Sequence, residues 1–67
     1  MKLKKLRQDA GLTQEDMAEE LGISRSSYIL KETSKRPFRP NEMIKTQKLL
    51  QEKLNNNYLS LEYIFFD

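Results

Sequence analysis

The side chains that could do chemistry gather between residues 24 and 36, and most of them are hydroxyls or cations. Three serines stand beside Arg25 in the run SRSS, and Lys35 and Arg36 follow later in the chain. Hydroxyl and basic side chains contact DNA phosphates, and a guanidinium can also donate twice to guanine O6 and N7. Such residues suit either a surface that contacts nucleic acid or an ordinary solvated surface.

The chain lacks the residue types on which most catalytic and metal sites depend. It has no cysteine and no histidine, which excludes a disulfide, a zinc site of either ligand type, and the Ser-His and Cys-His nucleophile arrangements. Paired carboxylates could still do acid–base work, but a chain of 67 residues leaves little room for a substrate pocket. We therefore expect no enzyme activity, no metal and no cofactor.

No segment has the pattern of a membrane span or a signal peptide. No apolar run approaches the ~20 residues that a spanning helix needs. The basic start from Lys2 to Arg7 is followed by Gln8-Asp9, where a signal peptide would need an apolar stretch. We expect a cytoplasmic protein.

The cations and hydroxyls belong to a pair of helices that we expect over about residues 13–33. Thr13 and Asp16 have the spacing of a capping box, which predicts a helix from about Gln14 to Leu21. Gly22 can adopt the left-handed conformation that ends this helix, and Ser24 can cap a second helix that runs to about Thr33. These features indicate a helix-turn-helix, whose second helix is presented to the major groove of DNA.

Charge is distributed unevenly along the chain. The net charge is only +2, which by itself says little about nucleic acid. Residues 9–24 carry five negative charges and no positive one, whereas residues 25–48 carry seven positive charges and two negative ones. Positive charge therefore lies on and after the second helix of the motif, where a DNA reader needs it. An ordinary solvated surface is the alternative interpretation of the same charges.

The rest of the chain predicts three further helices and a small core. They cover about residues 2–10, a segment from Pro40 or Asn41 to about Leu54, and a short segment, residues 61–66, that Ser60 can cap. We expect a single all-α domain over residues 1–67, with four or five helices, and the presence of the last helix favours a nearly complete chain. Phe38 should plug the loop into the core. The residues of the three helices that we expect to face inward are Leu3, Leu6, Ala10, Met43, Ile44, Leu50, Leu54, Leu61, Ile64 and Phe65.

Several residues do not fit a simple inward and outward division. Tyr28, Ile29 and Leu30 cannot all face inward on one helix, so we expect Leu30 to face a groove or a partner. Lys31 should bury its stem and keep its ammonium group at the surface. Tyr63 and Phe66 remain, and they either form a contact surface for a dimer or another protein or complete a thin core.

The stretch LKKLRQDAGLTQEDMAEELGISRSSY resembles the lambda-repressor-like family of regulators, also called the Cro-like or xenobiotic-response-element family. The tail, with KxxxKRPF and SLEYIFF, is similar to small regulators of temperate phages of Gram-positive bacteria. The resemblance implies a compact all-helical domain that binds operator DNA, usually as a dimer. The chain departs from the subgroup at Glu32, where an apolar residue is frequent, and at Ser34, where glycine is common. Both positions lie at the end of the second motif helix, so the two departures bear on how that end packs against the rest of the domain.

The resemblance also implies roles for individual residues. Arg25, Ser26 and Leu30 match the positions that reach base edges. Ser24 and Ser27 either contact phosphate or only cap the helix, and Lys35 and Arg36 either contact phosphate or are simply solvated. The full set of positions matched to DNA phosphate is Gln14, Ser24, Ser27, Lys31, Lys35 and Arg36.

Two functions are consistent with the sequence. The first is a sequence-specific DNA-binding transcriptional regulator, encoded by a phage or mobile element, that reads operator DNA with the helix of residues 24–33. The second is an antirepressor, which keeps the fold but captures a partner repressor protein. The low net charge and the apolar and aromatic side chains of Ile29, Tyr63 and Phe66 favour this second function.

Overall fold

Five helical segments make up the chain, which the computed structural model describes from residue 1 to residue 67. No strand is present, so the all-α prediction is confirmed. The first helices lie close to their predicted bounds, and the last segment is a single turn of π-helix. The segments are α1 (Leu3–Asp9), α2 (Gln14–Leu21), α3 (Arg25–Glu32), α4 (Pro40–Lys53) and η1 (Glu62–Phe66).

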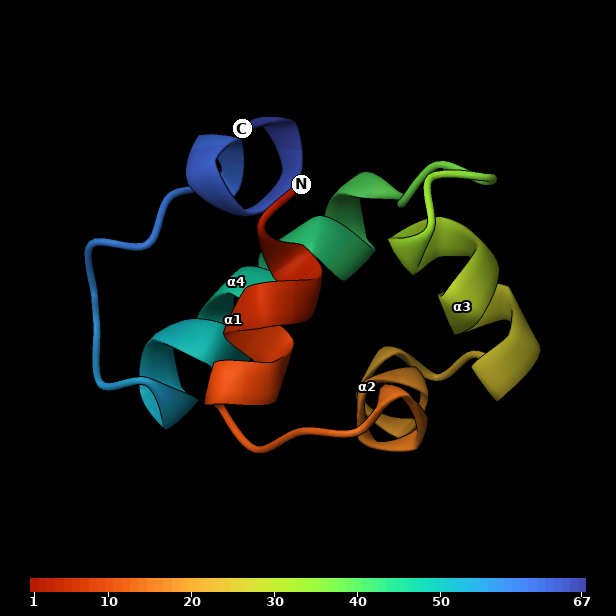
Figure 1. The fold of residues 1–67 in the computed structure, drawn as a ribbon, viewed down its shortest axis with the longest axis horizontal. Coiled ribbons are helices and arrows are strands. Elements are labelled where there is room, and N and C mark those ends of the chain that lie inside the picture. Colours follow the sequence, from red (N-terminus) through yellow and green to blue (C-terminus); the bar gives the residue numbers. More distant parts are fainter.

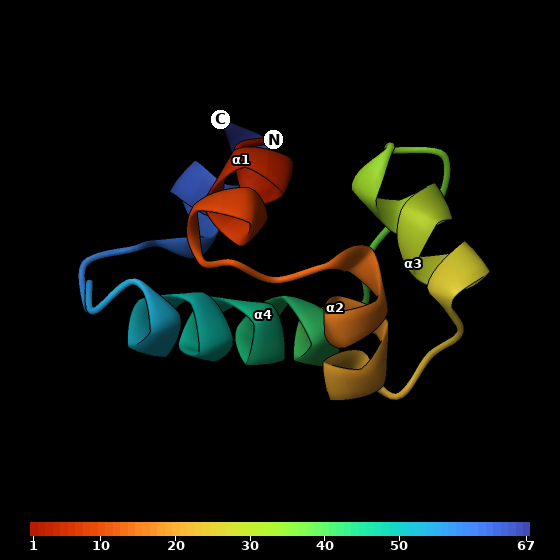
Figure 2. The ribbon, with the colours of Figure 1, turned by 60° about the horizontal axis from the view of Figure 1, so that its bottom comes forward.

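The helices are arranged so that the two ends of the chain meet. Figure 1 shows the N-terminus and the C-terminus side by side, and the backbone N–H of Lys2 donates to the carbonyl of Ile64 at 3.0 Å. α2 packs against both α3 and α4. α3 lies at one end of the molecule in both views (Figures 1 and 2), so one of its faces is left open. No helix is long and apolar enough to span a membrane.

Local capping sets the bounds of the two motif helices as the sequence predicts. The Asp16 backbone N–H donates to Thr13 Oγ1 at 3.0 Å, and the Thr13 backbone N–H donates to Asp16 Oδ2 at 2.8 Å, which completes the capping box. The backbone hydrogen bond from Thr13 also holds the pKa of Asp16 below its usual range. Gly22 is left-handed, with φ of 69°, and Ser24 caps α3. Short-range chemistry therefore determines the turn.

Ten buried apolar residues form one core that all five segments share. Five of them are among the residues predicted to face inward. Phe38 plugs the loop as expected, because its ring packs edge to face with Tyr28 and Phe65 at centroid distances of 6.1 and 5.1 Å. Full burial of one leucine, isoleucine, methionine or phenylalanine side chain stabilises a fold by about 1.5–3 kcal/mol. The ten are Leu3, Leu6, Met17, Ala18, Leu21, Tyr28, Leu50, Leu59, Ile64 and Phe65.

The prediction that Ile44 faces inward is wrong. Ile44 is 45% exposed, whereas Glu42, Thr46 and Leu50 are the buried residues of α4. Residues four apart share one face of a helix, and a residue two positions from Glu42 lies on the other side. Glu42 is held on the inner side by a buried ion pair described below, and this sets the rotation of α4.

Candidate nucleic-acid interface

The outward face of α3 carries Ser26, Ile29 and Leu30, and Thr33 follows at the C-cap of the helix; we call these four residues the α3 stripe. Ser26 and Thr33 are exposed, and Ile29 and Leu30 are half-buried. The core cluster and the residues packed against it include neither Ile29 nor Leu30, so both aliphatic side chains lie outside the core. The sequence had led us to expect this of Leu30.

Three serine hydroxyls lie together where α3 begins. Ser24 Oγ accepts from the Ser27 backbone N–H at 3.1 Å and donates to Ser27 Oγ at 3.0 Å. Ser26 Oγ lies 3.3 Å from Ser24 Oγ. The capping role of Ser24 is thus formed in the structure, and the guanidinium of the adjacent Arg25 is exposed and makes no ion pair or hydrogen bond.

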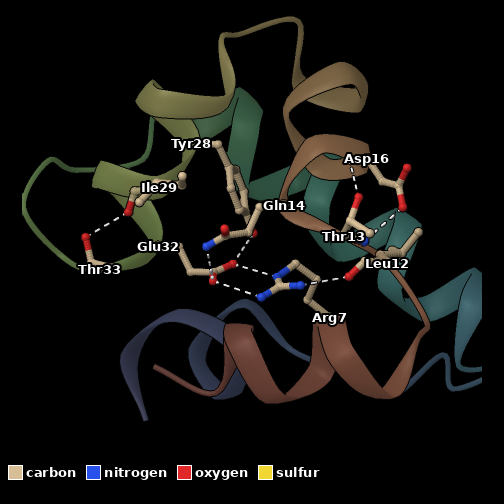
Figure 3. A network of polar contacts seen from close by, with 9 residues as sticks. All are labelled: Arg7, Leu12, Thr13, Gln14, Asp16, Tyr28, Ile29, Glu32 and Thr33. Atoms are coloured by element: carbon tan, nitrogen blue, oxygen red, sulfur yellow. Dashed lines mark hydrogen bonds and ion pairs between the residues drawn. The ribbon is translucent and has the colours of Figure 1, made fainter.

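The opposite face of α3 carries a buried polar network centred on Glu32, which is only 8% exposed (Figure 3). Arg7 of α1 donates from Nε to Glu32 Oε2 at 2.8 Å and from Nη2 to Glu32 Oε1 at 3.2 Å. A third Arg7 donor reaches the carbonyl of Leu12 at 2.8 Å. The Tyr28 hydroxyl donates to Glu32 Oε2 at 2.6 Å, and Gln14 Nε2 donates to Glu32 Oε1 at 3.2 Å. One carboxylate therefore joins α1, α2 and α3.

These partners explain how the end of α3 docks although Glu32 stands where an apolar side chain is frequent. Burial alone would raise the pKa of Glu32, but hydrogen bonds from Arg7, Tyr28 and Gln14 outweigh it and hold this pKa below its usual range. Burial, together with the hydrogen bond to Glu32, raises the pKa of Tyr28 well above its usual range. The Tyr28 hydroxyl therefore lies inside this buried network.

Sequence reasoning missed the network, although a signal was present. Glu32 lies four residues after Tyr28, so both side chains share the buried face of α3. A carboxylate on a buried face requires a charged or donor partner, since an unpaired buried charge is costly. The sequence could not show which of its many cations supplies that partner.

The prediction that Lys31 keeps its ammonium group at the surface is wrong. Lys31 is 7% exposed, and its Nζ donates to both carboxylate oxygens of Glu42 at 2.6 and 2.8 Å. Glu42 also accepts from the Arg39 backbone N–H at 2.8 Å. Burial would raise the pKa of Glu42, but these contacts hold it below its usual range. The pair joins α3 to the start of α4, and the ammonium group is not free for phosphate.

The loop after α3 presents unpaired cations beside the α3 stripe. Ser34 has a positive φ of 64°, which turns the chain so that the backbone N–H groups of Lys35 and Arg36 donate to the carbonyl of Leu30 at 2.8 and 3.2 Å. The side chains of both residues are exposed and make no ion pair. Arg39, a third exposed cation to which the sequence assigned no role, also makes no ion pair, although its charge helps to lower the pKa of Glu42. A hollow of about 520 Å³ is lined by Ser27, Arg36 and Arg39 among others.

The structure therefore brings together most of the residues singled out from the sequence, though not all. Arg25, Ser26 and Leu30 lie on or beside the outward face of α3, and the loop cations follow it directly. Gln14 is half-buried and already donates to Glu32. Tyr63 and Phe66, on η1, are 44% and 71% exposed.

Comparison with protein families gives one finding. A family model described as helix-turn-helix matches residues 3–45, which includes α1, α2, α3 and the start of α4 and is well over half of the chain. Comparison with curated proteins and with solved structures gives no match.

Proposed function

Because this chain belongs to the lambda-repressor and Cro-like helix-turn-helix family of DNA-binding regulators, we propose that it reads operator DNA sequence-specifically with α3 in the major groove. The observation that carries this proposal is the set of unpaired cations around the α3 stripe. Arg25 precedes the stripe, and Lys35 and Arg36 follow it, and none of the three has a partner within the molecule. Lys35 and Arg36, beyond the end of α3, suit the phosphates beside a groove, and Arg25, at the start of the helix, is free to reach a base edge.

The proposed roles follow from where each side chain lies. Arg25 donates to a guanine edge, and Ser26 and Leu30 contact neighbouring base edges. Lys31 is left out of the phosphate contacts because Glu42 holds its ammonium group, and Arg39 is added because its side chain is free beside Arg36. Ser24 only caps the helix, because its hydroxyl proton goes to Ser27 Oγ. The proposed phosphate contacts are then Gln14, through the amide N–H that Glu32 leaves free, together with Ser27, Lys35, Arg36 and Arg39.

The test is fluorescence anisotropy with a duplex from the protein's own promoter region and a scrambled duplex, over a salt series. Arg25→Ala should weaken binding to the promoter duplex by about 5- to 150-fold and remove most of the preference for it, since one bidentate base contact contributes ~1–3 kcal/mol. Lys35→Ala should weaken binding to both duplexes alike and lower the slope of log affinity against log salt by about one.

The matched control is Lys45→Ala, which removes an exposed cation of α4 outside this surface. It should leave the preference unchanged. Weak binding that is equal on both duplexes and indifferent to Arg25 would contradict the proposal.

Exposed aromatic residues favour a second candidate, in which the chain captures a partner repressor or pairs with a second copy. Phe66 is 71% exposed and Tyr63 is 44% exposed, both on η1. Aromatic side chains are enriched in protein interfaces. Phe66→Ser should then abolish dimerisation, measured by analytical ultracentrifugation, or capture of the partner repressor. If both persist in the variant, this surface has no such role.

We also propose a phage or mobile element as the source of the chain, acting in the cytoplasm of its host.

A further inference from the structure

We infer that the α3 stripe selects duplexes that present thymine 5-methyl groups in the major groove. The inference rests on the proposed function, because it requires α3 to enter that groove. The inference names the chemical group on the DNA that the middle and end of α3 recognise. The guanine contact proposed for Arg25 lies at the other end of the same helix.

The centre of the α3 stripe is aliphatic and half-buried. Ile29 and Leu30 occupy its centre, and neither packs against the core. These side chains can neither donate nor accept a hydrogen bond, so the polar edges of guanine, cytosine and adenine offer them nothing. The 5-methyl group of thymine is the one apolar group that a natural base pair presents in the major groove.

The polar ends of the α3 stripe are already engaged within the protein. Thr33 Oγ1 donates to the carbonyl of Ile29 at 2.7 Å, so its hydroxyl proton is used within the protein. Ser26 Oγ lies 3.3 Å from Ser24 Oγ. Ser26, at the beginning of the stripe, keeps the base contact proposed above. No side-chain donor is free at the middle and end of the stripe, so base discrimination there depends on apolar contact.

The surroundings of the α3 stripe favour DNA over an apolar protein partner. Arg25 lies at its beginning, and Lys35 and Arg36 lie just beyond its end. All three side chains are exposed and unpaired. A polyanion satisfies these cations while the aliphatic centre approaches the floor of the groove, whereas an apolar partner surface would leave them unpaired.

The experiment removes the methyl groups from the DNA, so that folding of the protein is never in question. The preferred duplex is first selected from a random library with the full chain. Each thymine in it is then replaced, one at a time, by deoxyuridine, which differs only in lacking the 5-methyl group. We expect at least one replacement to weaken binding by about fourfold, the factor that corresponds to exposing one methyl-sized apolar group.

Protein variants identify the side chain responsible. Leu30→Ala or Ile29→Ala should bind the thymine and deoxyuridine duplexes equally at the position that the missing side chain contacts. Ile44→Ala removes a 45% exposed aliphatic side chain from α4 and serves as the matched control, which should keep the full fourfold difference. Circular dichroism of each variant checks that the helices remain.

Each result decides between separate conclusions. A preferred duplex that is insensitive to every deoxyuridine replacement overturns the inference and leaves the proposed function intact. Variants of Ile29 and Leu30 that bind every duplex like the wild type also overturn it, and favour a protein partner for the α3 stripe. If selection yields no preferred duplex at all, the proposed function fails together with the inference.

Discussion

At the scale of single residues, the polar atoms of this small core differ in whether they have partners. Glu32 is only 8% exposed yet accepts hydrogen bonds from three side chains. Thr46 is completely buried, and its hydroxyl has no partner. A buried polar group without a hydrogen bond costs about 1–3 kcal/mol of stability. Thr46 is therefore a position at which stability can be gained.

Thr46→Val should raise the free energy of unfolding by about 1 kcal/mol. Valine keeps the shape of threonine and replaces the unpaired hydroxyl with a methyl group, so the penalty is removed without a cavity. Urea denaturation followed by circular dichroism measures the change. Thr46→Ser is the control, because it keeps the hydroxyl and loses the methyl group, and it should destabilise the protein. A valine variant less stable than the wild type would show that the hydroxyl has a partner.

Ser34→Gly should also stabilise the protein, by about 1 kcal/mol. Ser34 has φ of 64° at the turn after α3, a conformation that costs a residue with a Cβ atom free energy but costs glycine very little. Thermal unfolding measures the change. Ser34→Ala is the matched control, since alanine keeps the Cβ atom and should give no gain. An equal gain from both variants would locate the effect in the serine hydroxyl.

At the scale of elements, two buried ion pairs hold α3 in place. Arg7–Glu32 joins α3 to α1, and Lys31–Glu42 joins it to α4. Their side chains are at most 8% exposed, whereas those of the i,i+4 pair Lys5–Asp9 are 75% and 51% exposed. An exposed pair contributes little, but removing one partner from a buried pair leaves a charge without compensation. The orientation of α3 therefore depends on residues far from its outward face.

Glu32→Ala should lower the free energy of unfolding by about 3–5 kcal/mol, which is most of the stability expected for a domain of this size. The variant leaves the Arg7 guanidinium and the Tyr28 hydroxyl buried without their acceptor. Chemical denaturation measures the loss. The control is Asp9→Ala, which breaks the exposed pair with Lys5 and should change stability by less than ~1 kcal/mol. Equal losses in the two variants would contradict this account of the network.

At the scale of the whole molecule, the same carboxylates couple folding to pH. The folded protein holds the pKa values of Glu32 and Glu42 below their ordinary value of 4.5, so the unfolded chain binds protons more readily. Their contribution to stability is complete above pH 4.5 and is lost as the pH falls through the depressed values. Unfolding free energies measured from pH 7 to pH 2.5 should therefore fall steeply below about pH 4.5. A flat profile over this range would contradict the assignment.

At alkaline pH the free energy of unfolding should fall as the pH rises, because the pKa of Tyr28 is raised in the folded protein. The fold favours the neutral phenol, so its contribution is complete below the ordinary pKa of 10.0 and is lost as the pH rises above it. Absorbance of the tyrosinate form against pH should show Tyr28 titrating only as the protein unfolds.

The sequence by itself determined the elements of this protein and the motif they form. The capping box at Thr13 and Asp16, the left-handed Gly22 and the Ser24 cap each depend on atoms no more than about one helical turn apart, so residue types and spacing suffice to predict them. The same short-range pattern carries the family resemblance, which the family match over residues 3–45 confirms.

Only the tertiary structure decided how the faces of these helices meet. Arg7 and Glu32 are 25 residues apart, and Lys31 and Glu42 are 11 apart. Which cation meets which carboxylate depends on the packing of whole helices, and no local spacing encodes it. The same packing rotates α4 so that Ile44 is exposed, withdraws the Lys31 ammonium group from the surface, and leaves the α3 stripe open.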